Sequence, residues 1–265
     1  MGERRVGFVL AGGGFKGAFE LGALQHLVGT LGVVPQVITA TSAGAVLGTV
    51  LGQARDQAEC RQRLVEAEGD LMAMTQTDVV FAEQPWLEQL DGTTAVIGAD
   101  ADDAPRRSRH HFEQVAEFTK TLVGGRNLEH GLPRAVLNLG PFESSIRGHV
   151  DAGIATVDPE LVARPGLSLR LAVTALKERQ THYVTEQGHL VGPDARTRRI
   201  GADGIDVIDG VIASASVPGV FPPRELGNDR YVDGGCLQNI PLQAAVDLGA
   251  TRIFTLVAVP VKPVK

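Results

Sequence analysis

A long stretch without charged residues near the N-terminus limits the folds open to this chain. No Asp, Glu, Lys or Arg occurs from Leu21 to Ala54. The stretch contains a short apolar run at Val34–Thr39, typical of a buried strand, and then small and apolar residues at helical spacing over Ser42–Gly52. Because an uncharged stretch with both periods belongs in the interior of a domain, we expect it to form part of the core of an α/β fold.

The residues before this stretch predict a strand, a tight turn and a helix. Val6–Leu10 is a short apolar run typical of a buried parallel strand. The glycine-rich segment Gly12–Gly17 follows at once. Apolar residues then recur at helical spacing over Phe15–Leu31, and Gly32 provides a stop signal. We expect these residues to form the first β-turn-α unit of the fold.

The same patterns predict further elements towards the C-terminus. Strands are expected at Leu167–Leu176, His182–Glu186, Arg230–Asp233 and Arg252–Val259, and helices at Ile205–Ala215 and Pro241–Leu248. The first two of these strands are separated by a short polar connection, so we expect them to form a hairpin or to lie as neighbours.

Residues 55–130 have a different character. Charged helical patterns occur at Gln57–Met74 and Arg109–Leu122, and Asp91–Ser108 has the composition of a loop. These patterns predict a helical excursion from the sheet. Because the sequence contains no internal repeat and no linker long enough to divide it, we expect residues 1–265 to form a single domain with a cap-like helical excursion at about 55–130.

The composition excludes several classes of protein. The 265 residues carry 25 Lys and Arg against 31 Asp and Glu, a net charge of −6, which argues against a nucleic-acid-binding protein. With 43% hydrophobic residues, the chain is also not intrinsically disordered. No apolar run approaches the roughly 18 residues of a membrane span, and glycines interrupt any signal peptide. We therefore expect a cytoplasmic protein whose membrane contact, if any, is peripheral.

The candidate ligand residues favour neither a metal nor a cofactor. Two cysteines, Cys60 and Cys236, cannot form a disulfide framework, and no His and Cys residues cluster at the spacing of a zinc site. The acidic residues Asp100, Asp102 and Asp103 lack the glycine and the terminal glutamate of a calcium loop. We accordingly expect no metal and no cofactor, and a reducing compartment.

The glycine-rich turn is suited to binding an anion. Gly12–Gly17 fits G-x-G-x-x-G between a strand and a helix, but no acidic residue for a dinucleotide ribose occurs between Glu20 and Asp56. A Walker loop is excluded because Lys16 is followed by Gly17, where Ser or Thr is needed. Two interpretations remain open: the backbone N–H groups of the turn stabilise an anion such as a transient oxyanion, or the glycines only form a tight turn.

Ser42 has the sequence context of a nucleophile elbow. Ala40–Gly44 follows a predicted strand and opens a predicted helix, where a sharp turn would lift the serine hydroxyl above the edge of the sheet. The usual pattern is G-x-S-x-G, and Ala40 in the first position adds a methyl group where strand and helix approach. The alternative is that Ser42 only caps the N-terminus of a buried helix.

A nucleophilic serine needs a base, and the histidines are poorly placed for this role. None of the seven follows His189, and neither His182 nor His189 lies in a loop after a late strand, where α/β-hydrolases keep their histidine. Asp233 ends a short strand and precedes Gly234 and Gly235. A partly desolvated carboxylate can take the serine proton directly, because its pKa then rises. The alternative is that Asp-Gly-Gly is only a turn.

Taken together, these blocks resemble the patatin-like phospholipases over nearly the whole chain. The resemblance lies in Gly12–Gly17, Thr41–Ala45, Ala213–Pro223, Asp233–Gly235 and Asn239–Leu242, in this order. It implies a three-layer α/β/α fold with a mixed, mostly parallel central sheet. Within Ala213–Pro223, the proline-rich Val217–Pro223 is expected to shape a loop beneath the site.

The resemblance also implies roles for single residues. Ser42 would be the nucleophile, and Asp233 would complete a Ser/Asp dyad that uses no histidine. The oxyanion hole would be formed by Gly12, Gly13 and Gly14, with Lys16 beside it. The neighbouring small residues would support the turns: Gly17, Ala40, Gly44, Gly234 and Gly235.

The implied activity is that of a serine acyl hydrolase. It would cleave fatty-acyl esters of phospholipids, lysophospholipids or related lipids through an acyl-enzyme. The expected partners are a lipid or acyl-ester substrate and a peripheral membrane surface. Two alternatives stay open: an acyltransferase or thioesterase that uses the same dyad, and a non-catalytic lipid-binding or regulatory protein, for which Ala40 is the hint.

Overall fold

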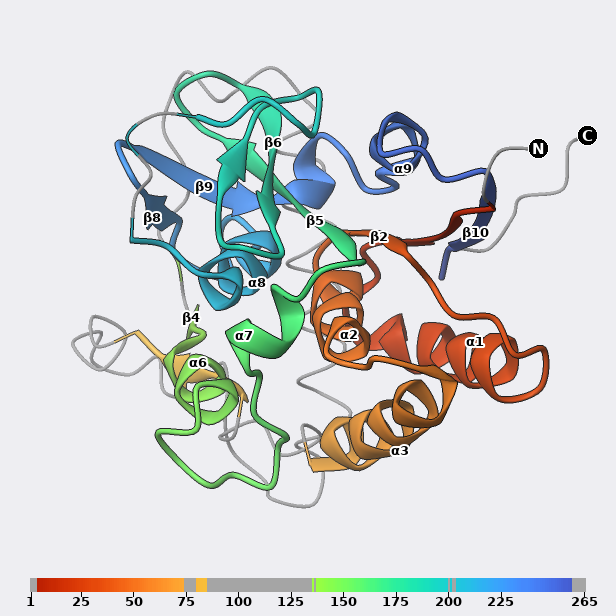
Figure 1. The fold of residues 1–265 in the computed structure, drawn as a ribbon. Helices are drawn as coiled ribbons and strands as arrows, with labels where there is room; N and C mark the ends of the chain where they lie inside the picture. Colours follow the sequence, from red (N-terminus) through yellow and green to blue (C-terminus); the bar gives the residue numbers. More distant parts are fainter. Residues whose placement is uncertain are drawn as a thin grey trace, which may run out of the picture.

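A mixed β-sheet lies at the centre of the fold (Figure 1). The computed structural model describes residues 4–73, 80–84, 135, 137–199, 201 and 204–258. The strands of the sheet are β1 (Val6–Leu10), β2 (Val37–Ala40), β5 (Ser168–Ala175), β6 (Gln180–Thr185), β7 (Leu190–Val191), β8 (Arg224–Leu226), β9 (Asp229–Asp233) and β10 (Arg252–Leu256). The order of the main strands is β10-β1-β2-β5-β6-β7. In addition, β9 pairs with β5 on one side and with β8 on the other.

The directions of the strands confirm a mixed α/β sheet. β10, β1, β2 and β5 pair with one another in parallel, whereas the pairings of β6, β7, β8 and β9, including those of β6 and β9 with β5, are antiparallel. β5 and β6 pair directly, as the hairpin interpretation predicted. The sequence patterns do not predict β8, because three residues are too few for a hydrophobic period to show.

Helices cover both faces of this sheet (Figure 1). The helical elements are η1 (Gly14–Lys16), α1 (Gly17–Gly29), α2 (Ala43–Gly52), α3 (Gln57–Ala73), α6 (Gly140–Ile146), α7 (Pro159–Val162), α8 (Val207–Ala215), η3 (Gly234–Cys236) and α9 (Leu242–Asp247). Phe8 and Leu10 of β1 belong to the core that contains residues of α1, α2, α3 and α8. Val9, between them, packs with residues of α9 on the opposite face.

The start of the first predicted helix differs from the structure for a local reason. The helix predicted over Phe15–Leu31 begins with the 3-10 turn η1 and becomes α-helical only at Gly17. The excursion predicted after residue 55 begins with α3 as expected, whereas Arg109–Leu122 and Asp91–Ser108 lie outside the described residues. A small two-stranded sheet of β3 (Ala82–Glu83) and β4 (Leu137–Asn138) was not predicted, because its strands are too short.

A buried glutamate lies on the core face of α1. Glu20 is 0% exposed, and within the described part of the chain neither of its carboxyl oxygens has a hydrogen-bond partner. Desolvation by burial raises the pKa of Glu20 from 4.5 to about 8, and the nearby backbone of Ala11 only partly opposes this. The side chain is therefore neutral in the folded protein at neutral pH.

Replacing Glu20 with glutamine is expected to change how stability depends on pH. The folded protein keeps the Glu20 proton up to a pKa of about 8, whereas the unfolded chain releases it near 4.5. The stability that Glu20 contributes is thus fully present below pH 4.5 and is lost as the pH rises to 8. Over this range the variant should gain on the order of 4 kcal/mol in free energy of unfolding relative to wild type.

Denaturant unfolding at several pH values measures this difference. The exposed Glu68, on α3, provides the control, because Glu68→Gln should run parallel to the wild-type profile. Parallel profiles for Glu20→Gln and wild type would show that Glu20 does not titrate in this range.

Candidate active site

The register of the sheet brings together the ends of the two strands that lead to Ser42 and Asp233. β2 runs parallel to β5 and ends with Ala40 opposite Leu171. β9 runs antiparallel to β5 and ends with Asp233 opposite Val173. The carboxyl ends of β2 and β9 therefore point towards each other along one edge of β5. Ser42 lies two residues beyond the end of β2, so the predicted nucleophile and the predicted base come from opposite sides of this junction.

The backbone of Ser42 has the conformation of a sharp turn. Its φ of 55° and ψ of −123° are those of the first central residue of a type II′ turn, where glycine is usual. Ser42 precedes α2, but its side chain makes no capping hydrogen bond, and its backbone is not in the extended region of an N-cap. The simple N-cap interpretation is therefore wrong. The half-buried Ser42 hydroxyl takes no part in capping the helix.

Two close contacts hold the Ser42 turn against the sheet. The Ser42 N–H donates to the Ser214 hydroxyl at 2.9 Å, and this hydroxyl donates in turn to the Ala172 carbonyl at 2.7 Å. At Gly44, a Cβ would lie 2.7 Å from the Leu10 carbonyl oxygen, so only glycine fits there. Ser214, on α8, was not predicted as a site residue, although it lies in the Ala213–Pro223 block.

Asp233 is fixed by its backbone and by its carboxylate. Its side chain is buried, and Oδ1 accepts the Gly235 N–H at 2.6 Å. The Asp233 N–H donates to the Ser216 carbonyl at 2.9 Å, and the Asp233 carbonyl accepts the Thr174 hydroxyl at 3.1 Å. Gly234 lies so close to β5 that a Cβ would be 2.3 Å from the Ala172 carbonyl oxygen. The Asp-Gly-Gly turn thus presents a buried, oriented carboxylate.

The glycine-rich turn borders the same place. Gly12 faces Ser42, since a Cβ on Gly12 would lie 3.2 Å from the Ser42 Cβ. Gly14 adopts a positive φ of 56° and, like the buried Gly17, lines a cavity beside Ser42. Among the described residues, none accepts a hydrogen bond from the N–H groups of Gly13 and Gly14. These groups are therefore available to an anionic ligand.

Asn239 connects the glycine-rich turn to the Asp-Gly-Gly turn. Its carbonyl accepts the Gly12 N–H at 3.2 Å, and its side-chain Nδ2 donates to the Gly12 carbonyl at 3.2 Å. Its Oδ1 lies beside Gly235, where it would be 3.0 Å from an added Cβ. Asn239 was not predicted as a site residue; the only sequence signal was its place in the family-like block Asn239–Leu242.

The methyl group of Ala40 is accommodated by a glycine on α2. Ala40 is fully buried, and a Cβ built on Gly48 would lie 3.2 Å from the Ala40 Cβ and 3.0 Å from Cγ2 of Ile38. The strand and the helix therefore approach closely at Gly48. Ala40 replaces the usual first glycine of G-x-S-x-G, and Gly48, about one turn into α2, leaves room for its methyl group.

Adding a methyl group at Gly48 is expected to destabilise the fold through this contact. Gly48→Ala should lower the free energy of unfolding by about 1 kcal/mol, because overpacking outweighs the better helix propensity of alanine. In the Ala40→Gly background the loss should shrink by at least about 0.5 kcal/mol. Denaturant unfolding of wild type, Gly48→Ala, Ala40→Gly and the double variant measures the coupling between the two positions. Gly22→Ala, in open space on α1, should cost nothing, and equal losses in both backgrounds would contradict the contact.

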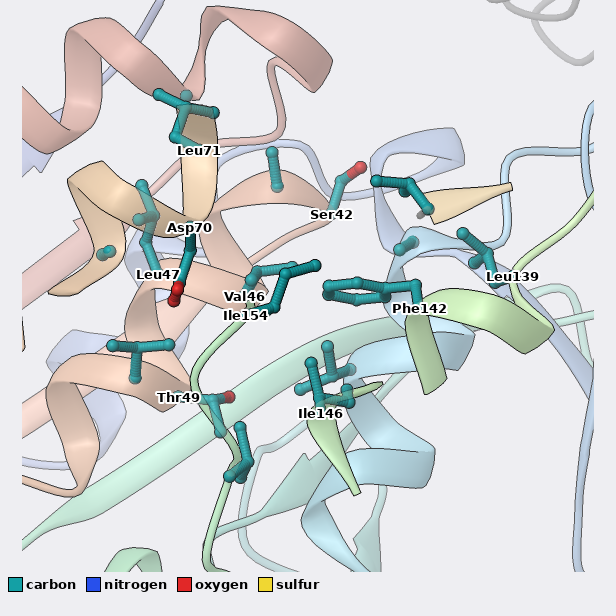
Figure 2. Close-up of a pocket in the computed structure, with 18 of the residues that line it drawn as sticks. Ser42, Val46, Leu47, Thr49, Asp70, Leu71, Leu139, Phe142, Ile146 and Ile154 are labelled. Carbon is teal, nitrogen blue, oxygen red and sulfur yellow. The ribbon is translucent and has the colours of Figure 1, made fainter. Parts of the chain in front are cut away.

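An apolar cavity of about 160 Å³ opens beside Ser42 (Figure 2). Its walls come from α1, α2, α3, α6 and α8, and they include Val217 and Phe221 of the proline-rich segment. Most of the lining side chains are aliphatic or aromatic. In Figure 2, Phe142 of α6 and Val46 of α2 approach the cavity from different elements. Such a cavity suits an apolar chain next to the Ser42 hydroxyl.

Other reactive side chains near the site are held in structural roles. His182, on β6, is buried, and its Nδ1 lies 3.1 Å from the Tyr231 hydroxyl. No described histidine lines the cavity. Cys236 is free, and burial, followed by the charge of Asp233, raises the pKa of its thiol to about 12. A thiol with this pKa is a poor nucleophile near neutral pH.

The described residues contain no metal-binding cluster and no membrane-spanning helix. Within this part of the chain, no three His, Cys, Asp or Glu side chains form a group that could hold a metal ion. None of its helices is both long enough and apolar enough to cross a bilayer.

Comparison with known proteins identifies the family. The model of the family described as "Patatin-like phospholipase" matches residues 8–246. The chain belongs to the patatin-like phospholipase family. The family description refers to phospholipase activity. No curated protein sequence matches the chain.

Two solved structures are similar to this patatin-like chain. VipD from Legionella pneumophila is 16% identical with a TM-score of 0.43, over 96% of this chain and 49% of its own. The type III effector protein ExoU is 19% identical with a TM-score of 0.30, over 82% of this chain and 40% of its own. The chain thus spans about half the length of the first and two fifths of the second.

Proposed function

We propose that the chain is a serine acyl hydrolase that cleaves fatty-acyl esters of phospholipids or lysophospholipids with a Ser42/Asp233 dyad. The observation that carries this proposal is the junction of β2 and β9 on one edge of β5. β2 leads to a serine in a strained turn beside an apolar cavity, and β9 ends at a buried carboxylate. A capping role does not account for Ser42, since its hydroxyl caps no helix.

The first half of the proposed reaction forms an acyl-enzyme. Ser42 Oγ attacks the ester carbonyl carbon while the Asp233 carboxylate takes its proton. The negative charge that develops on the carbonyl oxygen is stabilised by the N–H groups of Gly13 and Gly14. The N–H of Gly12, expected from the sequence to take part, is instead bound to the Asn239 carbonyl. The ester C–O bond then breaks, and protonated Asp233 returns the proton to the leaving alcohol.

The second half regenerates the enzyme. Water attacks the acyl-enzyme carbonyl, Asp233 takes a proton from it, and the proton passes to Ser42 Oγ as the fatty acid leaves. The acyl chain occupies the cavity throughout. Lys16 is exposed at the end of η1 and adds positive charge beside the glycine-rich turn.

A fluorophosphonate probe tests this function directly. The probe reacts with an activated serine, so wild-type protein should be labelled and the labelled peptide should contain Ser42. Ser42→Ala provides the negative control. If the folded wild-type protein takes no more label than this variant, the hydrolase proposal fails and a non-catalytic lipid-binding role gains support.

The fate of the acyl group separates hydrolysis from transfer. With a lysophospholipid as substrate, we expect free fatty acid as the product, and adding glycerol or a second lysophospholipid should not divert it. Acylated acceptor as the main product would instead identify an acyltransferase on the same dyad.

A further inference from the structure

The cavity beside Ser42 extends along α2. The lining residues of this helix run from Ser42 at its start to Val50, a span of about 12 Å at 1.5 Å per residue. Its volume of about 160 Å³ is close to that of a cavity of roughly 150 Å³ that holds benzene, so about six chain carbons fit inside. The cavity therefore suits the first part of an acyl chain of medium length.

One wall of this apolar cavity carries a carboxylate. Asp70 of α3 is the only charged side chain among the described residues that line it. Figure 2 shows Asp70 pointing into the cavity beside Leu47, with Ser42 towards one end and Thr49 towards the other. The hydroxyl of Thr49 is used within its own helix, where it donates to the Ala45 carbonyl at 2.8 Å. Asp70 is thus the polar group that a bound chain would meet.

Within the described part of the chain, Asp70 has one hydrogen bond and no cation as a partner. Its Oδ1 accepts the Ala155 N–H at 2.9 Å, and no other described residue donates to the carboxylate or forms an ion pair with it. The side chain is only 9% exposed. Burial raises the pKa of Asp70, the Ala155 N–H partly opposes this, and the charge of Glu66 adds to the rise. A buried carboxylate in this state gains from one more donor.

A donor on the acyl chain fits this position. Leu47 is five residues from Ser42, which corresponds to about 7.5 Å along α2. Figure 2 shows Asp70 beside Leu47. Since an extended chain advances about 1.2 Å per bond, the rise along α2 alone corresponds to about six bonds from the ester carbonyl, and reaching across to α3 requires slightly more. Because Oδ1 already accepts a backbone N–H, the remaining acceptor positions of the carboxylate are open to a hydroxyl group.

We propose that Asp70 is a specificity residue that selects acyl chains with a hydroxyl group about six to eight bonds from the ester carbonyl. This inference rests on the acyl hydrolase proposed above. The competing explanation is structural: Asp70 only ties α3 to the backbone at Ala155. Asp70→Asn separates the two, because an amide oxygen can still accept the Ala155 N–H while the charge that strengthens a bond to a hydroxyl is lost.

Binding to the Ser42→Ala protein tests the selection without turnover. The probes are methyl octanoate, methyl ω-hydroxyoctanoate and methyl 2-hydroxyoctanoate, measured by calorimetry. The ω-hydroxy ester should bind about tenfold tighter than the plain ester, the gain expected from a hydrogen bond to a charged group. The 2-hydroxy ester, with its hydroxyl next to the carbonyl, should not share this gain.

Variants of Asp70 in the same background complete the experiment. Asp70→Asn should bring the affinity ratio of the ω-hydroxy to the plain ester close to one, and Asp70→Leu should favour the plain ester. Glu68→Gln, an exposed neighbour on the same helix, should keep the tenfold ratio. Equal binding of the three esters by the Ser42→Ala protein, or an unchanged ratio in Asp70→Asn, would overturn the proposal.

The outcomes distinguish this inference from the proposed function. Wild-type protein that hydrolyses methyl octanoate but shows no preference for the ω-hydroxy ester would refute the role of Asp70 alone. Selective binding by the Ser42→Ala protein together with no hydrolysis by wild type would refute the hydrolase alone. If the Asp70 variants do not fold, the affinities of the Ser42→Ala protein for the three esters still test the proposal. Only a hydroxyl donor at the right position on the chain should raise the affinity.

Discussion

Ser42→Ala is expected to remove ester hydrolysis while leaving the fold intact. Loss of a nucleophilic serine lowers kcat by roughly 10³-fold to 10⁶-fold, because the remaining groups can only bind and polarise the ester. Alanine has the same Cβ, so the strained backbone at φ 55° is as tolerable as in wild type. Fatty acid release from a lysophospholipid, with circular dichroism as a check of folding, measures this effect.

Two further variants control for the loss of a hydroxyl and for backbone strain. Ser144→Ala, on α6 and outside the cavity lining, should keep full activity. Ser42→Gly should be inactive but more stable than Ser42→Ala by about 1 kcal/mol, because glycine adopts positive φ without strain. Near-normal hydrolysis by folded Ser42→Ala would show that another residue is the nucleophile.

Asp233→Asn is expected to lower the rate of ester hydrolysis nearly as much as Ser42→Ala. Asparagine keeps the size of the side chain and can still accept the Gly235 N–H, so the turn should form as in wild type. It cannot take the serine proton, and loss of a general base costs roughly 10²-fold to 10⁴-fold in kcat. The steady-state kinetics of ester hydrolysis by the purified variant measure this loss, and its melting temperature shows whether the fold is kept.

The same substitution four residues earlier provides a matched control. Asp229 begins β9, the strand that Asp233 ends, and its Oδ1 accepts the backbone N–H of Arg230. Asp229→Asn should therefore leave kcat unchanged. If the two variants hydrolyse esters equally well, Asp233 is not the base and the dyad is wrong.

Elements with a clear local pattern were predicted well from the sequence. Val6–Leu10 and Arg252–Leu256 form strands and Val207–Ala215 forms a helix because their apolar residues repeat with a period that matches the element. The short elements β7 and β8 were missed because two or three residues show no period. The short helix α6 was also not predicted.

The residues that support the site were harder to predict than those proposed to react. Ser42 and Asp233 lie in predicted turns that contain glycine and follow predicted strands, and this local context suggested chemistry. Ser214, Asn239 and Asp70 act through contacts with residues more than 80 positions away, and no local pattern signals such contacts. Gly48 likewise matters only because α2 packs it against Ala40.

By itself, the sequence determined the glycine-rich turns, the strand and helix around each of them, and the candidate residues Ser42 and Asp233, since these features depend on neighbouring residues. Only the tertiary structure decided that the strands leading to the two candidates end next to each other on β5. β2 and β9 approach along one edge of β5 because pairing in register aligns Ala40 with Leu171 and Asp233 with Val173. Register and packing join residues nearly 200 positions apart, so the cavity and the place of the Asp70 carboxylate in it follow from the fold and from no local pattern.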